Sequence, residues 1–259
     1  HQQSPASAQG MNLGIQDAHN LAWKLALCVR GSGRSVLLDS YDEERRAAAA
    51  ASQARADEVA GLLAPTLTLR QAVNREGREA LVRLLAVFSD FRERVARGLA
   101  MLDGRYGLGL IIPAALGSLG GGPSTGEPAP DLALGGDRLF ARLAGARHLL
   151  LLFSGGPECA DALPLLRRLA LDVRSAYPES VAALVVLQRS EGAQGPDEVL
   201  DPDGAVHLRF GARSDAFVLC RPDQFVAFRS QPAQPEAEDA LFTFLENILG
   251  PPALPRTSL

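Results

Sequence analysis

The chain has 259 residues, of which 47% are hydrophobic, enough for one large or two ordinary domains with cores of their own. A net charge of −4 and a sequence pI of about 5.6 argue against nucleic acid or an anionic membrane as a partner. No apolar run reaches the roughly 20 residues that span a bilayer, and no signal-peptide pattern begins the chain. We therefore expect no membrane contact and a cytoplasmic location.

The first thirty residues combine a loop of small residues with an amphipathic helix. The loop reads SPASAQG, and a ligand could approach its backbone closely. Apolar residues then recur at three- and four-residue spacings and predict a helix over residues 12–30 with one apolar stripe: Leu13, Ala18, Leu21, Ala22, Leu25, Ala26 and Val29. The N-terminus of such a helix offers unpaired N–H groups and the positive end of the helix dipole, which stabilise electron-rich oxygen atoms. On these grounds alone, an ordinary turn remains the alternative.

The string PASAQGMNLGIQDAHNLAWKLA, residues 5–26, resembles the last flavin-contacting motif of the FAD-dependent aromatic hydroxylases, the class that includes phenol hydroxylase. The resemblance implies that Pro5 lies beside the flavin ring and that the backbone of Gly10, Met11 and Asn12 faces the N1 and O2 edge of the ring. Gln9 belongs to the same FAD-contacting set. The resemblance implies no catalytic residue in this chain, and it marks Asp17, Asn20 and Trp23 as scaffold positions.

The phosphate-binding GxGxxG turn of a dinucleotide-binding domain is not recognisable in the sequence. The glycine-rich run GSLGGGP, residues 117–123, has neither a strand nor a helix in the required place, and we interpret it as part of a linker. The resemblance therefore predicts the C-terminal part of a hydroxylase whose FAD-binding domain lies upstream or on another chain. We expect the apolar stripe of the first helix to lack, within this chain, the sheet that it should cover.

A second helix is predicted over residues 36–63. Its segment LLDSYDEERRAAA resembles the same hydroxylases, with Ala47 where the family usually has proline. We interpret Glu44, Arg45 and Arg46 as a solvated helical face, with ion pairs to the upstream flavin domain as the alternative. Pro65 is expected to interrupt this helix.

Beyond that proline, residues 69–97 are predicted to add one or two helices with an apolar face. Tyr106 follows them and is interpreted as a residue of a pocket wall rather than as a catalyst.

The remainder predicts a second domain behind a linker. Residues 1–112 form the helical part, residues 113–130 the extended or mobile linker, residues 131–250 an α/β domain and residues 251–259 a tail. The α/β domain shows a β-α-β-α-β-β-α order and a closing hairpin that reads VLCRPDQFVAFR. It resembles the thioredoxin-like C-terminal domain of phenol hydroxylase and of the aromatic polyketide hydroxylases. We expect this domain to be expressed stably on its own from about Pro128 if its core is complete.

Redox chemistry is not expected in the thioredoxin-like domain. A thioredoxin needs paired cysteines at its first strand-to-helix turn, whereas the turn here reads SGGPECAD with Cys159 alone. Ser214, Asp215 and Ala216 stand where a thioredoxin has its cis-proline. A peroxidatic role for Cys159 is a minor alternative. Three cysteines without CxxC spacing and four scattered histidines predict reduced thiols and no metal site.

The fold expected from the sequence is thus α/β, with a helical segment that completes an FAD-binding domain followed by a thioredoxin-like domain. The expected function is that of the C-terminal portion of a flavin-dependent monooxygenase that hydroxylates a phenolic or polyketide ring with NAD(P)H and O2. Its expected partners are FAD, an aromatic small molecule and a second copy of the chain. The alternative is a non-catalytic assembly or dimerisation module with a redox-inactive thioredoxin-like domain.

Overall fold

A computed structural model describes residues 10–68, 104–117, 120–156, 162–188 and 195–254. The chain folds as two compact units. One contains residues 1–17 and 45–105, and the other contains residues 18–44 and 106–259. The helices predicted over residues 69–97, together with Pro5, Gln9 and Cys159, lie outside the described residues.

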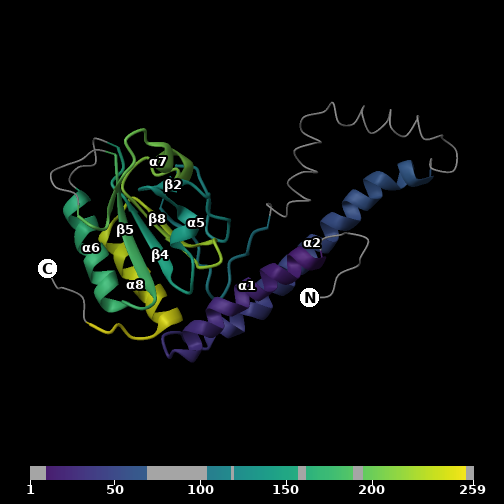
Figure 1. Ribbon diagram of the computed structural model, residues 1–259, viewed down its shortest axis with the longest axis horizontal. Helices are drawn as coiled ribbons and strands as arrows, with labels where there is room; N and C mark the ends of the chain where they lie inside the picture. Colours follow the sequence, from purple (N-terminus) through teal and green to yellow (C-terminus); the bar gives the residue numbers. More distant parts are fainter. Residues whose placement is uncertain (1–9, 69–103, 118–119, 157–161, 189–194, 255–259) are drawn as a thin grey trace. The chain divides into compact units, whose positions relative to one another are not determined.

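Two long helices begin the described chain (Figure 1). Helix α1 spans Gly10–Val29, close to its predicted bounds, and Gly31 follows it with a φ of 72°. Helix α2 spans Val36–Thr68, so the prediction that Pro65 interrupts it is wrong. A proline removes only one backbone hydrogen bond, and here it lies in the last turn, where the helix has little further to propagate.

Helix α1 differs from an ordinary surface helix because several of its polar side chains are buried and several of its large apolar side chains are exposed. Its buried residues recur at helical spacing and are half polar: Leu13, Asp17, Asn20, Trp23, Lys24 and Leu27. Several residues of the predicted apolar stripe are instead exposed, with Leu25 at 41% and Val29 at 84% of their full accessible surface. In the described part of the chain, most of the stripe is therefore exposed, as expected.

A six-stranded mixed sheet forms the centre of the second unit. Its order is β1-β8-β7-β4-β5-β6. The bounds are β1 Leu116–Gly117, β4 His148–Phe153, β5 Val181–Leu187, β6 Glu198–Leu200, β7 Ala216–Cys220 and β8 Val226–Gln231. Strand β7 runs antiparallel to its neighbours β4 and β8, and the other pairs are parallel. A two-stranded ribbon, β2 Ala133–Leu134 with β3 Asp137–Arg138, precedes the central strand β4.

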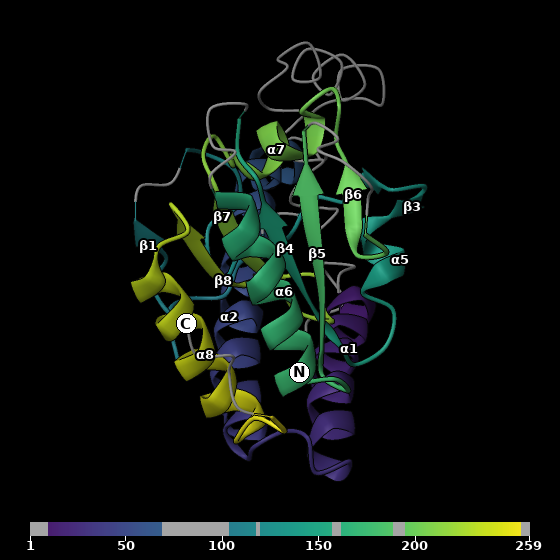
Figure 2. The same cartoon turned by 90° about the vertical axis from the view of Figure 1, so that its left-hand side faces the viewer.

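Helices cover both faces of this sheet, because side chains alternate along each strand. Leu150 and Leu152 of β4 pack with helices α6 (Leu163–Ala176) and α8 (Pro235–Leu249), which lie together on one face in Figure 2. Leu149 and Leu151 face the short helices α5 (Leu139–Arg142) and α7 (Ala205–Phe210). This arrangement confirms the predicted α/β class.

The segment predicted to be a linker packs against the sheet in its described part. Residues 116–117 form β1, which pairs with β8, and the N–H groups of Gly126 and Ala129 donate to the carbonyls of Val226 and Gln224. Gly122, with a φ of 71°, leaves no room for a Cβ beside the carbonyl of Phe210. The segment was expected to be an extended or mobile linker, and its described part is packed against the sheet, because its glycines permit close backbone approach.

Candidate functional site

The predicted flavin-contacting residues that the structure describes form the first turn of α1. Gly10, Met11 and Asn12 open the helix, Met11 is 76% exposed, and this turn contains no acidic side chain. The first N–H groups of an α-helix have no partner four residues earlier, so this end is positively polarised and can donate to an electron-rich oxygen. The turn therefore has the donor chemistry that the edge of a flavin ring requires.

An ion pair between helices holds α1 directly behind this turn. The Nε atom of Arg45 on α2 donates to Oδ1 of Asp17 at 2.6 Å, and both side chains are buried. Nη2 of Arg45 lies 3.5 Å from Oε1 of Gln16. Arg45 was expected on a solvated face, so this part of the expectation is wrong.

Farther along α1, a group of polar side chains is buried between the two helices and the β7–β8 hairpin. We call it the buried charge cluster, and it comprises Asn20, Lys24, Glu44, Tyr106, Arg221 and Asp223. Its two cations and two carboxylates balance in charge. Such pairing is the condition under which ionised groups are tolerated in a protein interior.

Arg221 lies at the centre of the cluster and makes two bidentate ion pairs. Its Nη1 and Nη2 atoms donate to the two oxygens of Glu44 at 2.6 and 2.9 Å. Its Nε and Nη2 atoms donate to the two oxygens of Asp223 at 2.9 and 2.6 Å. The guanidinium carbon also lies 5.2 Å from the ring centre of Trp23 and 4.9 Å from that of Tyr106. Charge pairing and cation–π contact therefore fix this side chain together.

Helix α1 joins the cluster through two side chains. Nδ2 of Asn20 lies 2.9 Å from Oε2 of Glu44, 3.0 Å from Oδ2 of Asp223 and 3.1 Å from Oη of Tyr106. Nζ of Lys24 donates to Oε2 of Glu44 and to Oγ of Ser40, each at 2.9 Å. Polar contacts thus supplement the apolar packing of Trp23 and Leu27 on the buried face of this helix.

The pKa values of the cluster members shift in directions set by the balance between burial and the neighbouring charges. Burial opposes ionisation of Glu44, but Arg221 and Lys24 outweigh it and lower the pKa of this carboxyl to about 2. Burial and the nearby Arg221 lower the pKa of Lys24 to about 8, although Glu44 acts in the opposite direction. The pKa of Arg221 is raised well above its usual value by Asp223 and Glu44, against the effect of burial.

The local sequence explains why Arg221 and Asp223 meet. Pro222 suits the second position of a β-turn, and the carbonyl of Arg221 accepts from the N–H of Gln224 at 2.9 Å. Gln224 has a φ of 72°, which closes the hairpin onto Phe225. The turn therefore places the Asp223 carboxylate against the guanidinium of the residue that starts it.

Sequence reasoning placed Asn20 and Trp23 on the scaffold but missed the roles of Lys24, Glu44 and Arg221. Glu44 was expected on a solvated face together with Arg45, and both are buried, whereas Arg46 is exposed. A usable signal was present on α1, where Asp17, Asn20 and Lys24 share a helical face with the buried Leu13 and Leu27. No local pattern identified the partner Arg221, which is 177 residues from Glu44.

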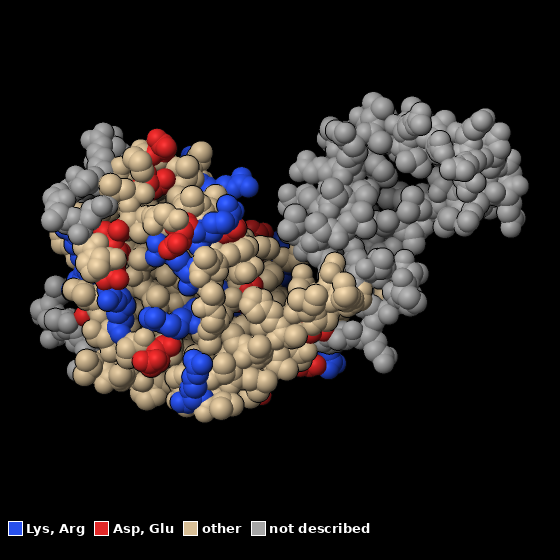
Figure 3. All heavy atoms as spheres, viewed as in Figure 1, with Lys and Arg blue, Asp and Glu red and all other residues tan. Residues whose placement is uncertain are grey.

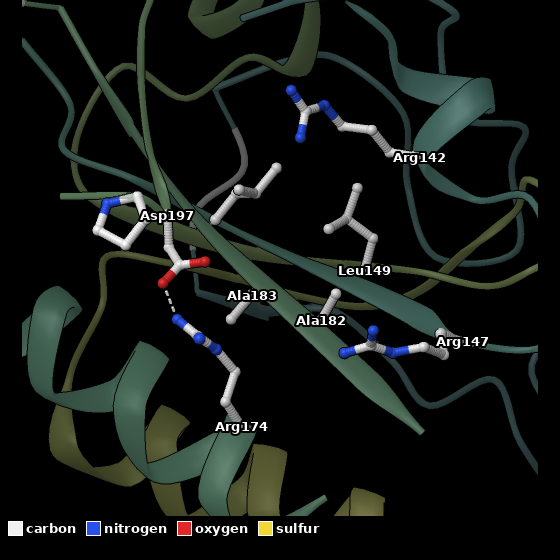
Figure 4. A pocket seen from close by; sticks show the side chains of 9 residues that line it. Arg142, Arg147, Leu149, Arg174, Ala182, Ala183 and Asp197 are labelled. Atoms are coloured by element: carbon white, nitrogen blue, oxygen red, sulfur yellow. Dashed lines mark hydrogen bonds and ion pairs between the residues drawn. The ribbon is translucent and has the colours of Figure 1, made fainter. Parts of the chain in front are cut away.

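A separate cavity of about 410 Å³ lies beside β4 and β5 in the sheet unit. Arg142, Arg147 and Arg174 surround it, and Leu149 lines it from β4 (Figure 4). Arg174 is paired with Asp197, while Arg147 donates to the carbonyl of Val181. None of the predicted flavin contacts lines this cavity. On the face shown in Figure 3, basic and acidic side chains of the described residues are interspersed.

Thiol chemistry receives no further support from the described residues. Cys220 is fully buried, and burial raises its pKa to about 12. The cis peptide bond found in the described part, Gln231–Pro232, follows β8 rather than preceding β7. Within that part, no three potential metal ligands gather, and no helix has the length and apolarity needed to cross a membrane.

Comparisons with known proteins identify two segments of the chain. Residues 1–56 match the family described as FAD binding domain, and residues 122–252 match the family described as aromatic-ring hydroxylase, C-terminal.

Full-length relatives and solved structures agree with these family matches. Tetracenomycin A2 monooxygenase-dioxygenase from Streptomyces glaucescens is 33% identical over 96% of this chain and 40% of that protein. For 6-methylpretetramide 4-monooxygenase from Streptomyces rimosus, the identity is 32% over 89% of this chain and 40% of the relative. The crystal structure of aklavinone-11 hydroxylase with FAD and aklavinone has 25% identity and a TM-score of 0.62, covering 93% of this chain and 40% of that one. The chain therefore spans about two fifths of the length of these proteins.

The match to the aromatic-ring hydroxylase C-terminal family covers more than half of the chain, and the FAD-binding match includes the α1 turn described above. This chain therefore belongs to the FAD-dependent aromatic-ring hydroxylases.

Proposed function

We propose that this chain supplies the flavin-edge segment and the C-terminal domain of a monooxygenase that hydroxylates a phenolic or polyketide ring with NAD(P)H and O2. Bound FAD would supply the oxidising chemistry. The chain's own contribution is to bind one edge of the ring, to hold the binding helix in place and to exclude water from it. No general acid or base is assigned to this chain.

The observation that carries this proposal is the first turn of α1. Its first N–H groups, at Gly10–Asn12, and the absence of an acidic side chain in that turn fit the N1 and O2 edge of a flavin, where negative charge collects on reduction. The helix end, with about half a positive charge, stabilises that negative charge. Pro5 and Gln9 complete the proposed contact set from the residues just before the helix.

The exposed stripe of α1 supports an upstream partner. Met11, Ile15, Leu25 and Val29 are between 41% and 84% exposed and recur at helical spacing. A row of large apolar side chains on a long helix is typical of a surface that packs against another domain. We propose that the upstream part of the FAD-binding domain covers it.

The test uses a polypeptide that joins the upstream coding sequence to His1–Leu259. We expect it to bind FAD and to oxidise NAD(P)H when a phenolic or polyketide compound is present. Gly10→Pro removes one N–H donor from a position that tolerates proline, and it should weaken FAD binding about tenfold and make the flavin harder to reduce. Gly10→Ala retains the donor and is the matched control. Equal FAD affinity and equal reduction potential in the two variants would contradict the proposed contact.

The second candidate is the non-catalytic assembly module, which the same exposed stripe favours. It predicts that the chain associates with itself or with a flavin domain but leaves FAD affinity unchanged. Replacing Leu25 and Val29 by glutamine should then weaken association in sedimentation experiments without affecting flavin binding. A loss of FAD affinity in the joined polypeptide with these two substitutions favours the monooxygenase proposal instead.

A further inference from the structure

The buried charge cluster connects elements that are far apart in the sequence. Asn20 and Lys24 belong to α1, Glu44 to α2, and Arg221 and Asp223 to the turn between β7 and β8. All of them lie in the same compact unit. The C-terminal sheet therefore contacts the helix whose first turn carries the proposed flavin contacts.

We propose that Arg221 is a positioning residue, through which the β7–β8 hairpin of the C-terminal domain fixes helix α1 and thereby its first turn at Gly10–Asn12. Among the described residues, the side-chain contacts of Arg221 do not include the first turn of α1. It acts on α1 through Glu44 and Asp223, which are both shared with Asn20. The part that concerns the flavin rests on the function proposed above, whereas the part that concerns α1 does not.

The geometry requires arginine rather than any other cation. Two carboxylates are each held by two N–H groups in a planar fork, and the same guanidinium lies beside the rings of Trp23 and Tyr106. The point charge of a lysine would keep the charge balance but would lose the forked contacts. Lysine at this position should therefore allow folding and still leave α1 less firmly held.

The hairpin is a rigid base for this contact. Arg221 and Phe225 form a backbone hydrogen bond of 2.8 Å, and the flanking strands lie inside the six-stranded sheet. Helix α1, by contrast, has its apolar stripe exposed and its buried face half polar. Its position thus depends on polar contacts as well as on apolar packing, and Arg221 holds both carboxylates, Glu44 and Asp223, that accept from α1.

Hydrogen exchange on the His1–Leu259 chain tests the effect on α1 without any cofactor. Arg221→Lys should accelerate amide exchange in α1 about tenfold or more while the amides of β4 and β5 keep their rates. Asn20→Ala removes the contacts of one of the two α1 side chains in the cluster without leaving a buried charge unpaired, and it should also accelerate amide exchange in α1. Arg221→Met is the more severe form, because it also leaves buried Asp223 without its guanidinium partner and Glu44 with Lys24 as its remaining ion-pair partner.

The chain offers a matched control in Arg229 on β8. Its side chain is also fully buried, but it donates to the carbonyls of Pro123 and Phe210 and not to residues of α1 or α2. Arg229→Lys should therefore affect the sheet unit without a selective effect on α1. Equal acceleration of α1 exchange in the Arg221 and Arg229 variants overturns the proposal.

The proposed effect of Arg221 on flavin binding is tested in the joined polypeptide. The measurements are its dissociation constant for FAD and the visible spectrum of the bound flavin. Arg221→Lys and Asn20→Ala should weaken FAD binding severalfold and shift the spectrum, and Arg229→Lys should change neither. If α1 loosens but both flavin readings stay unchanged, the positioning role is overturned while the proposed function stands. If the unmutated polypeptide binds no FAD, the proposed function fails, and the exchange data decide the α1 contact alone.

Discussion

At the scale of single residues, several ionised side chains of this protein are buried. The four charged side chains of the buried charge cluster and the Asp17–Arg45 pair are all nearly inaccessible. Burying such groups costs several kcal/mol per ion, and their attraction offsets that cost only with good geometry. Ion pairs of this kind contribute less to net stability than apolar packing, but they tolerate few alternative arrangements. Fixing the position of a helix is a use that suits them.

The histidine beside this cluster gives a prediction about acid stability. His148 is fully buried next to Trp23, and burial together with nearby Arg221 lowers its pKa from 6.5 to about 4. The folded state keeps the ring neutral, whereas the unfolded state protonates it below about pH 6.5. The contribution of this ring to the free energy of unfolding is therefore fully present above pH 6.5 and is lost as the pH falls towards 4. The variant His148→Phe should therefore gain about 2 to 3 kcal/mol relative to the unmutated chain between pH 7.5 and 4.5. Urea titrations at several pH values measure this, and a constant difference would contradict it.

The two adjacent arginines of α2 provide a second prediction. Arg45→Met removes the guanidinium from buried Asp17 and should lower the free energy of unfolding by about 3 to 5 kcal/mol. Arg46 is exposed, and Arg46→Met should change the free energy of unfolding by no more than about 0.5 kcal/mol. Denaturant unfolding of both variants gives the comparison. Similar effects would restore the interpretation of both residues as a solvated face.

At the scale of elements, two short motifs determine the course of the backbone around them. The Arg-Pro-Asp-Gln turn determines where β7 ends and β8 begins, and it delivers two members of the buried charge cluster. The glycine-rich segment before the domain lies along the edge of the sheet, where side chains would collide with the neighbouring backbone. In both cases the backbone conformation, more than side-chain hydrophobicity, decides the local structure.

Two glycines allow the cost of a positive φ to be measured separately from the cost of a steric clash with the neighbouring strand. Gly117 and Gly136 both have positive φ, at 79° and 89°, but only at Gly117 would a Cβ meet a backbone carbonyl, that of Gln231. Alanine at either position should lower the free energy of unfolding by about 1 kcal/mol, because a residue with a Cβ is strained at positive φ. Gly117→Ala should cost about 1 to 3 kcal/mol more because β1 must move away from β8. Thermal unfolding of the two variants checks this, and equal losses would indicate that β1 is not firmly paired.

At the scale of the whole molecule, the structural unit does not follow the family boundary. Residues 18–44 match an FAD-binding domain but fold with the C-terminal sheet. Trp23, Leu27 and Leu37 belong to the same apolar core as helices α6 and α8. The C-terminal domain is therefore completed by helices that belong, by sequence, to the domain before it.

The second domain was expected to be expressed stably from about Pro128 if its core is complete, and this overlap shows that part of the core comes from residues before Pro128. A fragment of residues 128–259 lacks β1, the buried Ile111 and Ile112, and the Glu44 partner of Arg221. We expect it to unfold at a clearly lower temperature than His1–Leu259 and to expose apolar surface that binds a hydrophobic dye. Circular dichroism and dye fluorescence compare the two. An equally stable fragment would show that the helices contribute little to the domain.

The sequence by itself determined the features that depend on local pattern. Apolar strands such as HLLLLF, the helices around them and the motif that opens α1 are each recognisable within about 25 residues. They identified the α/β class, the order of the main elements and the resemblance to aromatic hydroxylases. The first-turn residues Gly10, Met11 and Asn12 came from that motif, and their contact with flavin stays a prediction.

Only the tertiary structure decided which polar residues are buried. Glu44 and Arg46 are two positions apart in one charged run, yet one is paired inside the protein and the other is exposed. The difference depends on Arg221, which reaches Glu44 across 177 residues of sequence. Burial of a charge is favourable only where a partner of opposite charge is brought to it, and the fold, not the local sequence, supplies that partner.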